Sequence, residues 1–121
     1  MKTTPNQAGA VAVSDLPEAI TKYLVARGQQ DVETTAAIFA ADATVTDEGR
    51  THHGRNEIRG WLGRSGSEYT YTTTLIAATK VDDDHFTVVQ HLEGDFPGGV
   101  VDLQFKFTLR NEEIAELVIE P

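Results

Sequence analysis

The segment "AAIFAADATVTDEG", residues 36–49, contains the change of pattern that decides the fold of this 121-residue chain. Its first half continues a helical spacing of apolar residues that begins after Asp31 and includes Ala36 and Phe39. Its second half, "ATVTD" at residues 43–47, is rich in β-branched residues and is typical of a short strand. The segment therefore predicts a helix followed by a strand that ends on a carboxylate, with a turn at "EG".

Two more helices are predicted on either side of this segment. Ser14 or Asp15 suits the N-cap of a first helix, and Gly28 suits its end. Asp31 then starts the second helix, so that the two form a hairpin joined by "GQQD". The third helix is "RNEIRGWLGR", residues 55–64, with its large apolar side chains on one face.

The remainder of the sequence is predicted to be β-sheet. "RTHHG" returns as the partner of the first strand, and four longer segments follow, separated by the turn-like "DDD", "PGG" and "NEE". Alternation in "VVDLQFKFTLR" places its apolar side chains on one face and its polar ones on the other. Helices first and an antiparallel sheet afterwards predict an α+β fold with the helices on one sheet face.

Composition excludes several classes of partner and site. The formal net charge is −9, so nucleic-acid backbones and anionic membrane surfaces would be repelled. The chain has no cysteine, which excludes disulfides and thiolate metal sites. No stretch approaches the roughly 18 apolar residues of a membrane span, and the start of the chain does not resemble a signal peptide. We expect a cytoplasmic protein with a flexible tail at residues 1–13 and one domain at residues 14–121.

The helix hairpin ending in "AAIFAADATVTDEG", the following "HGRNEIRGWL" and the long sheet resemble the nuclear transport factor 2-like superfamily, in particular its SnoaL-like and ketosteroid-isomerase-like members. The resemblance covers about residues 14–120. It implies a cone-shaped, curved antiparallel or mixed sheet wrapped around three N-terminal helices, a cystatin-like α+β roll. The open end of the cone would admit a small apolar or carbonyl-containing ligand, and many members are homodimers that use the outer sheet surface.

The resemblance also implies two catalytic candidates. Asp47 matches, without a gap from the first helix, the aspartate of steroid isomerases that removes a proton next to a carbonyl. Partial desolvation of such a base raises its pKa toward neutrality. Tyr23 matches the tyrosine that donates a hydrogen bond to the enolate oxygen. The residues alone favour a turn residue at Asp47 and a core residue of an amphipathic helix at Tyr23.

Other polar parts of an isomerase site are missing from the sequence. The position of the second acid falls on Phe105 or Gln104, and Leu62 stands where the supporting tyrosine would be. Steroid isomerisation as such is therefore not expected. Two functions stay open: a cofactor-independent isomerase, cyclase or dehydratase with Asp47 as general base, or a non-catalytic ligand-binding or protein-interaction module.

Further residues are candidates for contact with a ligand. Gln90 is polar on an otherwise apolar strand face, so it needs a partner from the protein, water or a ligand. The histidines do not share a face that would suit a metal ion, although His53 or His52 could assist Asp47. Neither a metal nor a cofactor is expected. The predicted ligand-binding residues are Gln90, Trp61, Tyr69, Tyr71, Phe86, Phe105 and His53.

Overall fold

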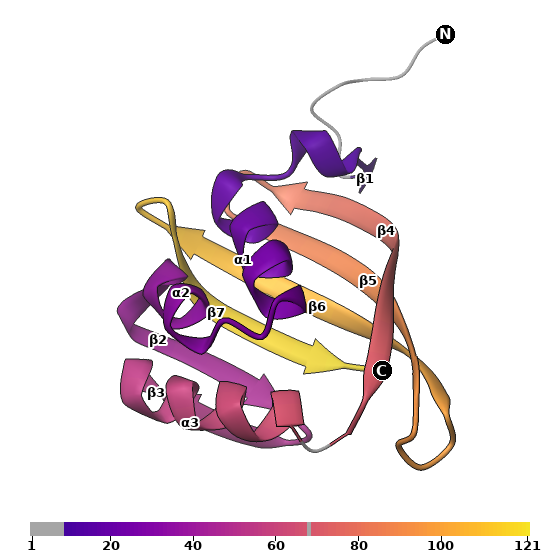
Figure 1. The fold of residues 1–121 in the computed structure, drawn as a ribbon. Helices are drawn as coiled ribbons and strands as arrows, with labels where there is room; N and C mark the ends of the chain where they lie inside the picture. The colour runs from indigo at the N-terminus through magenta and orange to yellow at the C-terminus, as the bar shows by residue number, and fades with distance from the viewer. Residues whose placement is uncertain (1–8, 68) are drawn as a thin grey trace, which may run out of the picture.

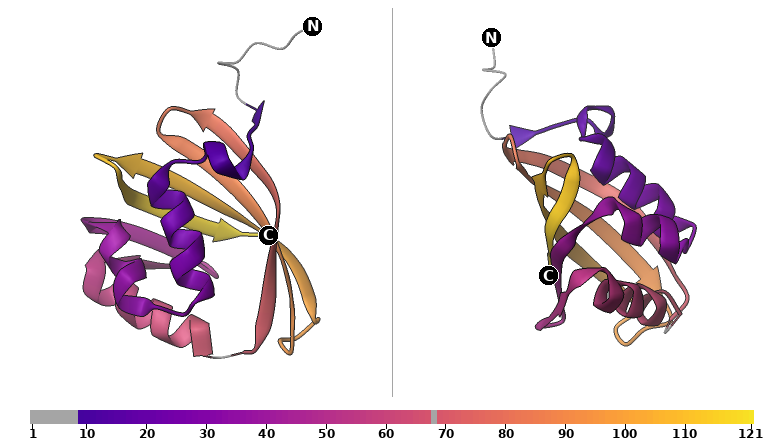
Figure 2. Two further views of the ribbon diagram at one scale, coloured as in Figure 1. Left: turned by 45° about the horizontal axis from the view of Figure 1, so that its top comes forward. Right: turned by 90° about the vertical axis from the view of Figure 1, so that its left-hand side faces the viewer.

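The computed structural model describes residues 9–67 and 69–121, and in it the helices lie on one face of a curved sheet (Figures 1 and 2). The helices are α1 (Glu18–Gly28), α2 (Val32–Ile38), α3 (Gly54–Ser67) and a short 3₁₀ helix, η1 (Val13–Asp15). The strands are β1 (Gly9–Ala10), β2 (Phe39–Asp47), β3 (Arg50–His53), β4 (Tyr71–Asp82), β5 (His85–Gly94), β6 (Val100–Arg110) and β7 (Glu113–Glu120). The predicted α+β class is confirmed.

The sheet is mixed, with the strand order β1-β4-β5-β6-β7-β2-β3. Strands β4 to β7 form the expected antiparallel meander. The chain's first long strand, β2, then pairs in parallel with its last strand, β7, so that Val45 lies beside Leu117 and Asp47 beside Ile119. This pairing places the end of β2 next to the C-terminus of the chain.

The junction between α2 and β2 follows the sequence closely. Asp31 is the N-cap of α2, and its carboxylate accepts a hydrogen bond from the backbone N–H of Thr34 at 3.1 Å. The helix ends at Ile38, and Phe39 already belongs to β2. The strand is thus longer than "ATVTD", and Phe39 packs into the core from the sheet and not from the helix.

The start of the first helix was predicted wrongly. Ser14 and Asp15 lie in η1, and α1 begins at Glu18 after Pro17. A residue before proline is pushed out of the helical region, and Leu16 accordingly has extended dihedrals of −71° and 146°. The helix therefore cannot run continuously from Ser14. Part of the predicted tail, residues 1–8, lies outside the described residues, whereas Gly9 and Ala10 pair with β4.

The core lies between the helices and the concave sheet face. The predicted alternation holds in β6, where Phe105 and Phe107 are buried and Lys106 is exposed. In β4 it changes phase at a bulge between Leu75 and Ala77, which leaves Ile76 exposed. The largest fully buried side chains include Tyr23, Phe39, Phe107, Ile20, Ile58, Leu62, Ile114 and Leu117.

Gly94, at the end of β5, is packed too closely for a side chain. A Cβ atom there would lie 2.4 Å from the carbonyl oxygen of Thr70 and 2.4 Å from Cβ of Tyr71. We expect Gly94→Ala to lower the free energy of unfolding by about 1–3 kcal/mol, measured by urea denaturation. Gly63→Ala is the matched control, because a Cβ at Gly63 meets nothing within 4 Å. Equal stability of the two variants would contradict this close packing.

Candidate active site

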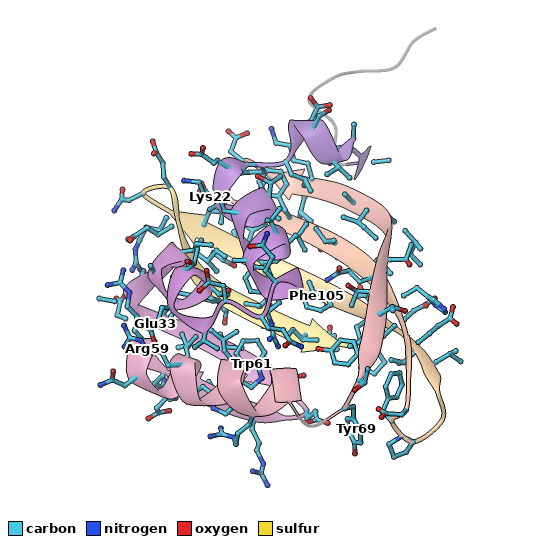
Figure 3. All side chains as sticks on the ribbon, in the orientation of Figure 1. Lys22, Glu33, Arg59, Trp61, Tyr69 and Phe105 are labelled. Carbon is cyan, nitrogen blue, oxygen red and sulfur yellow. The ribbon has the colours of Figure 1, made fainter. Side chains whose placement is uncertain are left out.

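A cavity of about 970 Å³ opens at the end of the sheet where β2 and β7 finish. Its walls come from the last turn of α1, the end of β2, α3, the first residues of β4, β5 with the loop after it, β6, and the C-terminus of β7. Six predicted site residues line it: Asp47, Trp61, Tyr69, Tyr71, Gln90 and Phe105. In Figure 3, Trp61 and Phe105 face the interior beneath α1, while Tyr69 lies at the edge beside the β5–β6 loop.

Asp47 is held in the cavity wall by a tryptophan. The alternation of β2 gives Asp47 the same face as Val45, which is fully buried in the core. Trp61, from α3, donates a hydrogen bond from Nε1 to Oδ2 of Asp47 at 3.0 Å. Arg55, a conceivable ion-pair partner, instead donates to the carbonyl oxygen of Phe39 at 2.9 and 2.7 Å. The Asp47 carboxylate thus accepts a hydrogen bond from an uncharged indole and lies beside an open cavity.

Tyr23 combines a core position with an unsatisfied polar group. Its ring is fully buried and packs edge-on against Phe39 and Phe107, with centroids 6.0 and 5.4 Å away. Among the described residues, its hydroxyl has no hydrogen-bond partner. Tyr23 does not itself line the cavity, but Arg27, Tyr71 and Asp47, which do, are near enough to affect the pKa of its hydroxyl.

Burial raises the pKa of the Tyr23 hydroxyl, and the nearby Arg27 guanidinium partly offsets this rise. The hydroxyl therefore stays protonated at neutral pH and is available as a donor.

Arg27 is the site residue that sequence reasoning did not identify. Its guanidinium carbon lies 4.9 Å from the centroid of the Trp61 ring, a cation–π geometry. It lies in the last turn of α1, one helical turn after Tyr23, and lines the cavity. The sequence did contain one signal for this role, because Arg27 is a charged residue on a helix face that is otherwise apolar.

Aromatic side chains surround the outer part of the cavity. Tyr69 and Tyr71 each pack edge-on against Phe96 of the β5–β6 loop, with centroids 6.2 and 6.4 Å apart. The loop is fixed to β4 by Asp95, whose carboxylate accepts a hydrogen bond from the backbone N–H of Thr70 at 2.8 Å. These contacts give the cavity an apolar rim that suits the flat or aliphatic body of a ligand.

The structure does not bring two predicted ligand-binding residues to this cavity. Phe86 is buried at the other end of β5, opposite Phe107. It lies on the predicted inner face of the strand, but it is too far along the strand to line the cavity. His53 is exposed, and its backbone N–H donates to the Glu57 carboxylate at 2.8 Å. His52 lies closer to the site, 6.2 Å from the Trp61 ring between centroids.

His91 forms a charged cluster on the outer face of the sheet. Its Nδ1 lies 2.6 Å from Asp102 and its Nε2 3.0 Å from Glu93. The hydrogen bond to Asp102, and then that to Glu93, raise the pKa of His91 above 6.5.

No helix in the part of the chain that the structure describes is long and apolar enough to cross a membrane.

This cluster predicts a pH dependence of stability. Because the folded pKa is raised, the stabilisation is complete below the unfolded pKa and is lost as the pH rises through the folded pKa. Urea denaturation between about pH 5 and 9 should show this fall in the wild type and a smaller one in His91→Gln. Parallel pH profiles for the two proteins would exclude a contribution from His91.

Comparisons with known proteins agree on one family. A family model described as the SnoaL-like domain matches residues 20–117. A Sinorhizobium meliloti protein, provisionally described as a polyketide cyclase, is 32% identical, with a TM-score of 0.84 over 91% of this chain and 100% of that one. No curated protein matches the sequence.

Two more solved structures are similar to this fold. A Catenulispora acidiphila protein with a ketosteroid isomerase-like fold, in complex with trimethylamine, is 27% identical, with a TM-score of 0.75 over 87% of this chain and 85% of that one. An epoxide hydrolase/cyclase-like enzyme of pyran ring formation in salinomycin has a TM-score of 0.72 at 19% identity, over 84% and 86% of the two chains. This last likeness concerns the fold alone.

Proposed function

Since the chain belongs to the SnoaL-like domain family, we propose that its cavity is a substrate site in which Asp47 acts as a general base on a small, largely apolar carbonyl compound. The observation that carries this proposal is the position of Asp47, in the wall of a 970 Å³ cavity with Oδ2 engaged by Trp61. A base must be oriented and must reach the substrate, and this arrangement meets both needs.

The proposed reaction begins with transfer of a proton from the carbon next to the carbonyl to the Asp47 carboxylate. The electron pair of that C–H bond moves into the carbonyl, which becomes an enolate. Trp61 would hold Oδ2 so that Oδ1 takes the proton. Return of the proton to another carbon gives an isomer. Attack of the enolate carbon on a second carbonyl instead closes a ring, and the alkoxide formed takes the proton back from Asp47. The step requires only a base and a donor to the enolate oxygen.

The second candidate function is a ligand-binding module without catalysis. It is favoured by the family resemblance, which places Phe105 or Gln104 where isomerases carry their second acid, so that no carboxyl group stands there; Phe105 lines the cavity. The trimethylamine complex of the Catenulispora relative also fits a role in binding small molecules. A protein of this kind would bind carbonyl compounds in the cavity without accelerating their proton exchange.

Deuterium exchange distinguishes the two functions without knowledge of the natural substrate. We propose to incubate small ketones such as tetralone and indanone with the protein in D₂O, and to follow loss of the α-proton signal by NMR. General-base catalysis predicts exchange faster than in buffer of the same pH. Binding of these ketones at the buffer rate of exchange would favour the binding module.

We also propose a homodimer that uses the outer sheet face, as the family resemblance implies. The exposed positions of β6 on this face include Asp102 and Lys106, so the interface would be polar and hydrated. Light scattering after size-exclusion chromatography measures the mass directly. A monomer of 13.2 kDa at all concentrations would remove this proposal.

A further inference from the structure

We propose that the cavity selects an elongated, neutral substrate with two polar ends: a carbonyl that reacts at Asp47, and a second hydrogen-bonding group that the side-chain amide of Gln90 binds. The inference rests on the proposed function and deepens it, since it names the class of substrate that the same cavity takes. The second group is a hydroxyl or a carbonyl, and an apolar body connects the two ends.

The side-chain amide of Gln90 is the observation that points to a ligand. Gln90 lies on the inner face of β5 between Val88 and Leu92, which are both buried. It is itself half-buried and lines the cavity. Within the described part of the chain, its amide makes no hydrogen bond to another residue. A ligand that displaces water from this amide has to replace the hydrogen bonds of that water, because a polar group left unsatisfied on binding lowers the affinity.

The floor of the cavity runs from Gln90 to Asp47 over apolar side chains. Gln90 pairs with Leu103 of β6, and Phe105 of the same strand pairs with Ile119 of β7. Ile119 in turn lies beside Asp47 of β2, and all five residues line the cavity. Strands β5 and β2 are three strand spacings apart, about 14 Å along the sheet (Figure 1). A ligand that reaches both ends therefore needs a long apolar body between two polar groups.

The distribution of charge in the cavity indicates that the second group is neutral. The residues of β4, β5 and β6 that line the cavity are aliphatic, aromatic, threonine or glutamine residues. The charged residues of the lining belong instead to α1, to the end of β2 with its turn, and to the end of β7. A charged group beside Gln90 would lose hydration without a countercharge on the strands around it, which is unfavourable. A hydroxyl or a carbonyl suits an amide, because an amide both donates and accepts.

The experiment uses the full chain and three ketones of one shape. Each is a cyclohexanone with a second cyclohexane ring opposite its carbonyl, and the far end of that ring carries a hydroxyl, a methyl or a carboxylate group. Trp61 is the single tryptophan of the chain, lines the cavity and contacts Asp47, so its fluorescence reports binding. We expect the hydroxyl ketone to bind about tenfold more tightly than the methyl ketone, as one neutral hydrogen bond would provide. The carboxylate ketone should bind more weakly than the hydroxyl ketone.

Gln90→Leu tests whether Gln90 is the residue that binds the hydroxyl. Leucine matches the apolar neighbours of Gln90 in the sheet, so the variant should fold and should bind the methyl ketone more tightly than the hydroxyl ketone. Gln104→Leu is the matched control, because it makes the same substitution on the neighbouring strand but on the outer face, where Gln104 donates to the carbonyl oxygen of Pro121 at 3.3 Å. It should keep the preference for the hydroxyl ketone.

The outcomes separate this inference from the proposed function, because α-proton exchange of the same ketones is followed by NMR in D₂O. A hydroxyl preference that Gln90→Leu removes, without exchange activity, would support the second polar contact and reject general-base catalysis. Exchange that depends on Asp47, with equal affinities for the hydroxyl and methyl ketones, would overturn the inference and keep the base.

Three further results would also overturn the inference. These are a hydroxyl preference that Gln90→Leu retains, tighter binding of the carboxylate ketone than of the hydroxyl ketone, and no binding of any of the three ketones. The wild-type comparison needs no variant, so it decides the substrate class even if Gln90→Leu does not fold.

Discussion

Asp47→Asn is expected to lower the rate of α-proton exchange by at least about a hundredfold. Asparagine has nearly the shape of aspartate, and its carboxamide oxygen can still accept the hydrogen bond from Trp61, which in the wild type measures 3.0 Å. The cavity should therefore keep its form while it loses the group that takes the proton. Exchange is measured by NMR in D₂O with tetralone, and binding by the fluorescence of Trp61.

The matched control is Asp42→Asn, since Asp42 lies on the same strand but is exposed and forms an ion pair with Arg110. Its exchange rate should equal that of the wild type. An Asp47→Asn variant that exchanges as fast as the wild type would show that another group is the base. A variant that no longer binds tetralone would instead indicate a structural role for Asp47.

Local chemistry made the centre of the fold predictable from sequence. The change from helical to strand spacing in residues 36–49, with the Asp31 cap, correctly placed the start of α2 and the end of β2, although β2 begins already at Phe39. In β2, Asp47 shares the face of the buried Val45, because successive side chains of a strand point to opposite faces. The parallel pairing of β2 with β7 is a long-range contact, which no local pattern in either strand encodes.

The candidate site was less predictable, for a related reason. Parity gives the face of a side chain but not its distance from one end of the sheet, so Phe86 shares a face with Gln90 yet lies away from the cavity. The contact of Arg27 with Trp61 joins two helices whose packing is set by the core. The position of Arg27 on an otherwise apolar helix face gave no indication of this contact.

Tyr23 shows why the core and site interpretations of one residue are not alternatives. Its ring lies in the core, and its buried hydroxyl is near enough to Arg27 and Asp47, which line the cavity, for them to affect its pKa. Edge-on packing of the ring against Phe39 and Phe107 holds the hydroxyl in place. Residues that pack against this ring should therefore affect both stability and the site.

Phe107→Ala is expected to cause the largest loss of stability among the substitutions considered, about 3–5 kcal/mol in the free energy of unfolding. Phe107 is 1% exposed and meets the Tyr23 ring edge-on at 5.4 Å. In the sheet it lies between Phe86 on β5 and Leu117 on β7, both of them buried. Its removal would leave a cavity that these well-ordered neighbours can fill only in part.

Urea denaturation gives the loss, and Lys106→Ala is the control on the same strand. Lys106 points to the outer face and pairs with Glu120, so its removal should change the free energy by less than about 1 kcal/mol. Because a domain of this size has a total stability of about 5–15 kcal/mol, Phe107→Ala should leave a marginal or unfolded protein. A loss below about 1 kcal/mol would mean that Phe107 is not packed between the sheet and α1 as described.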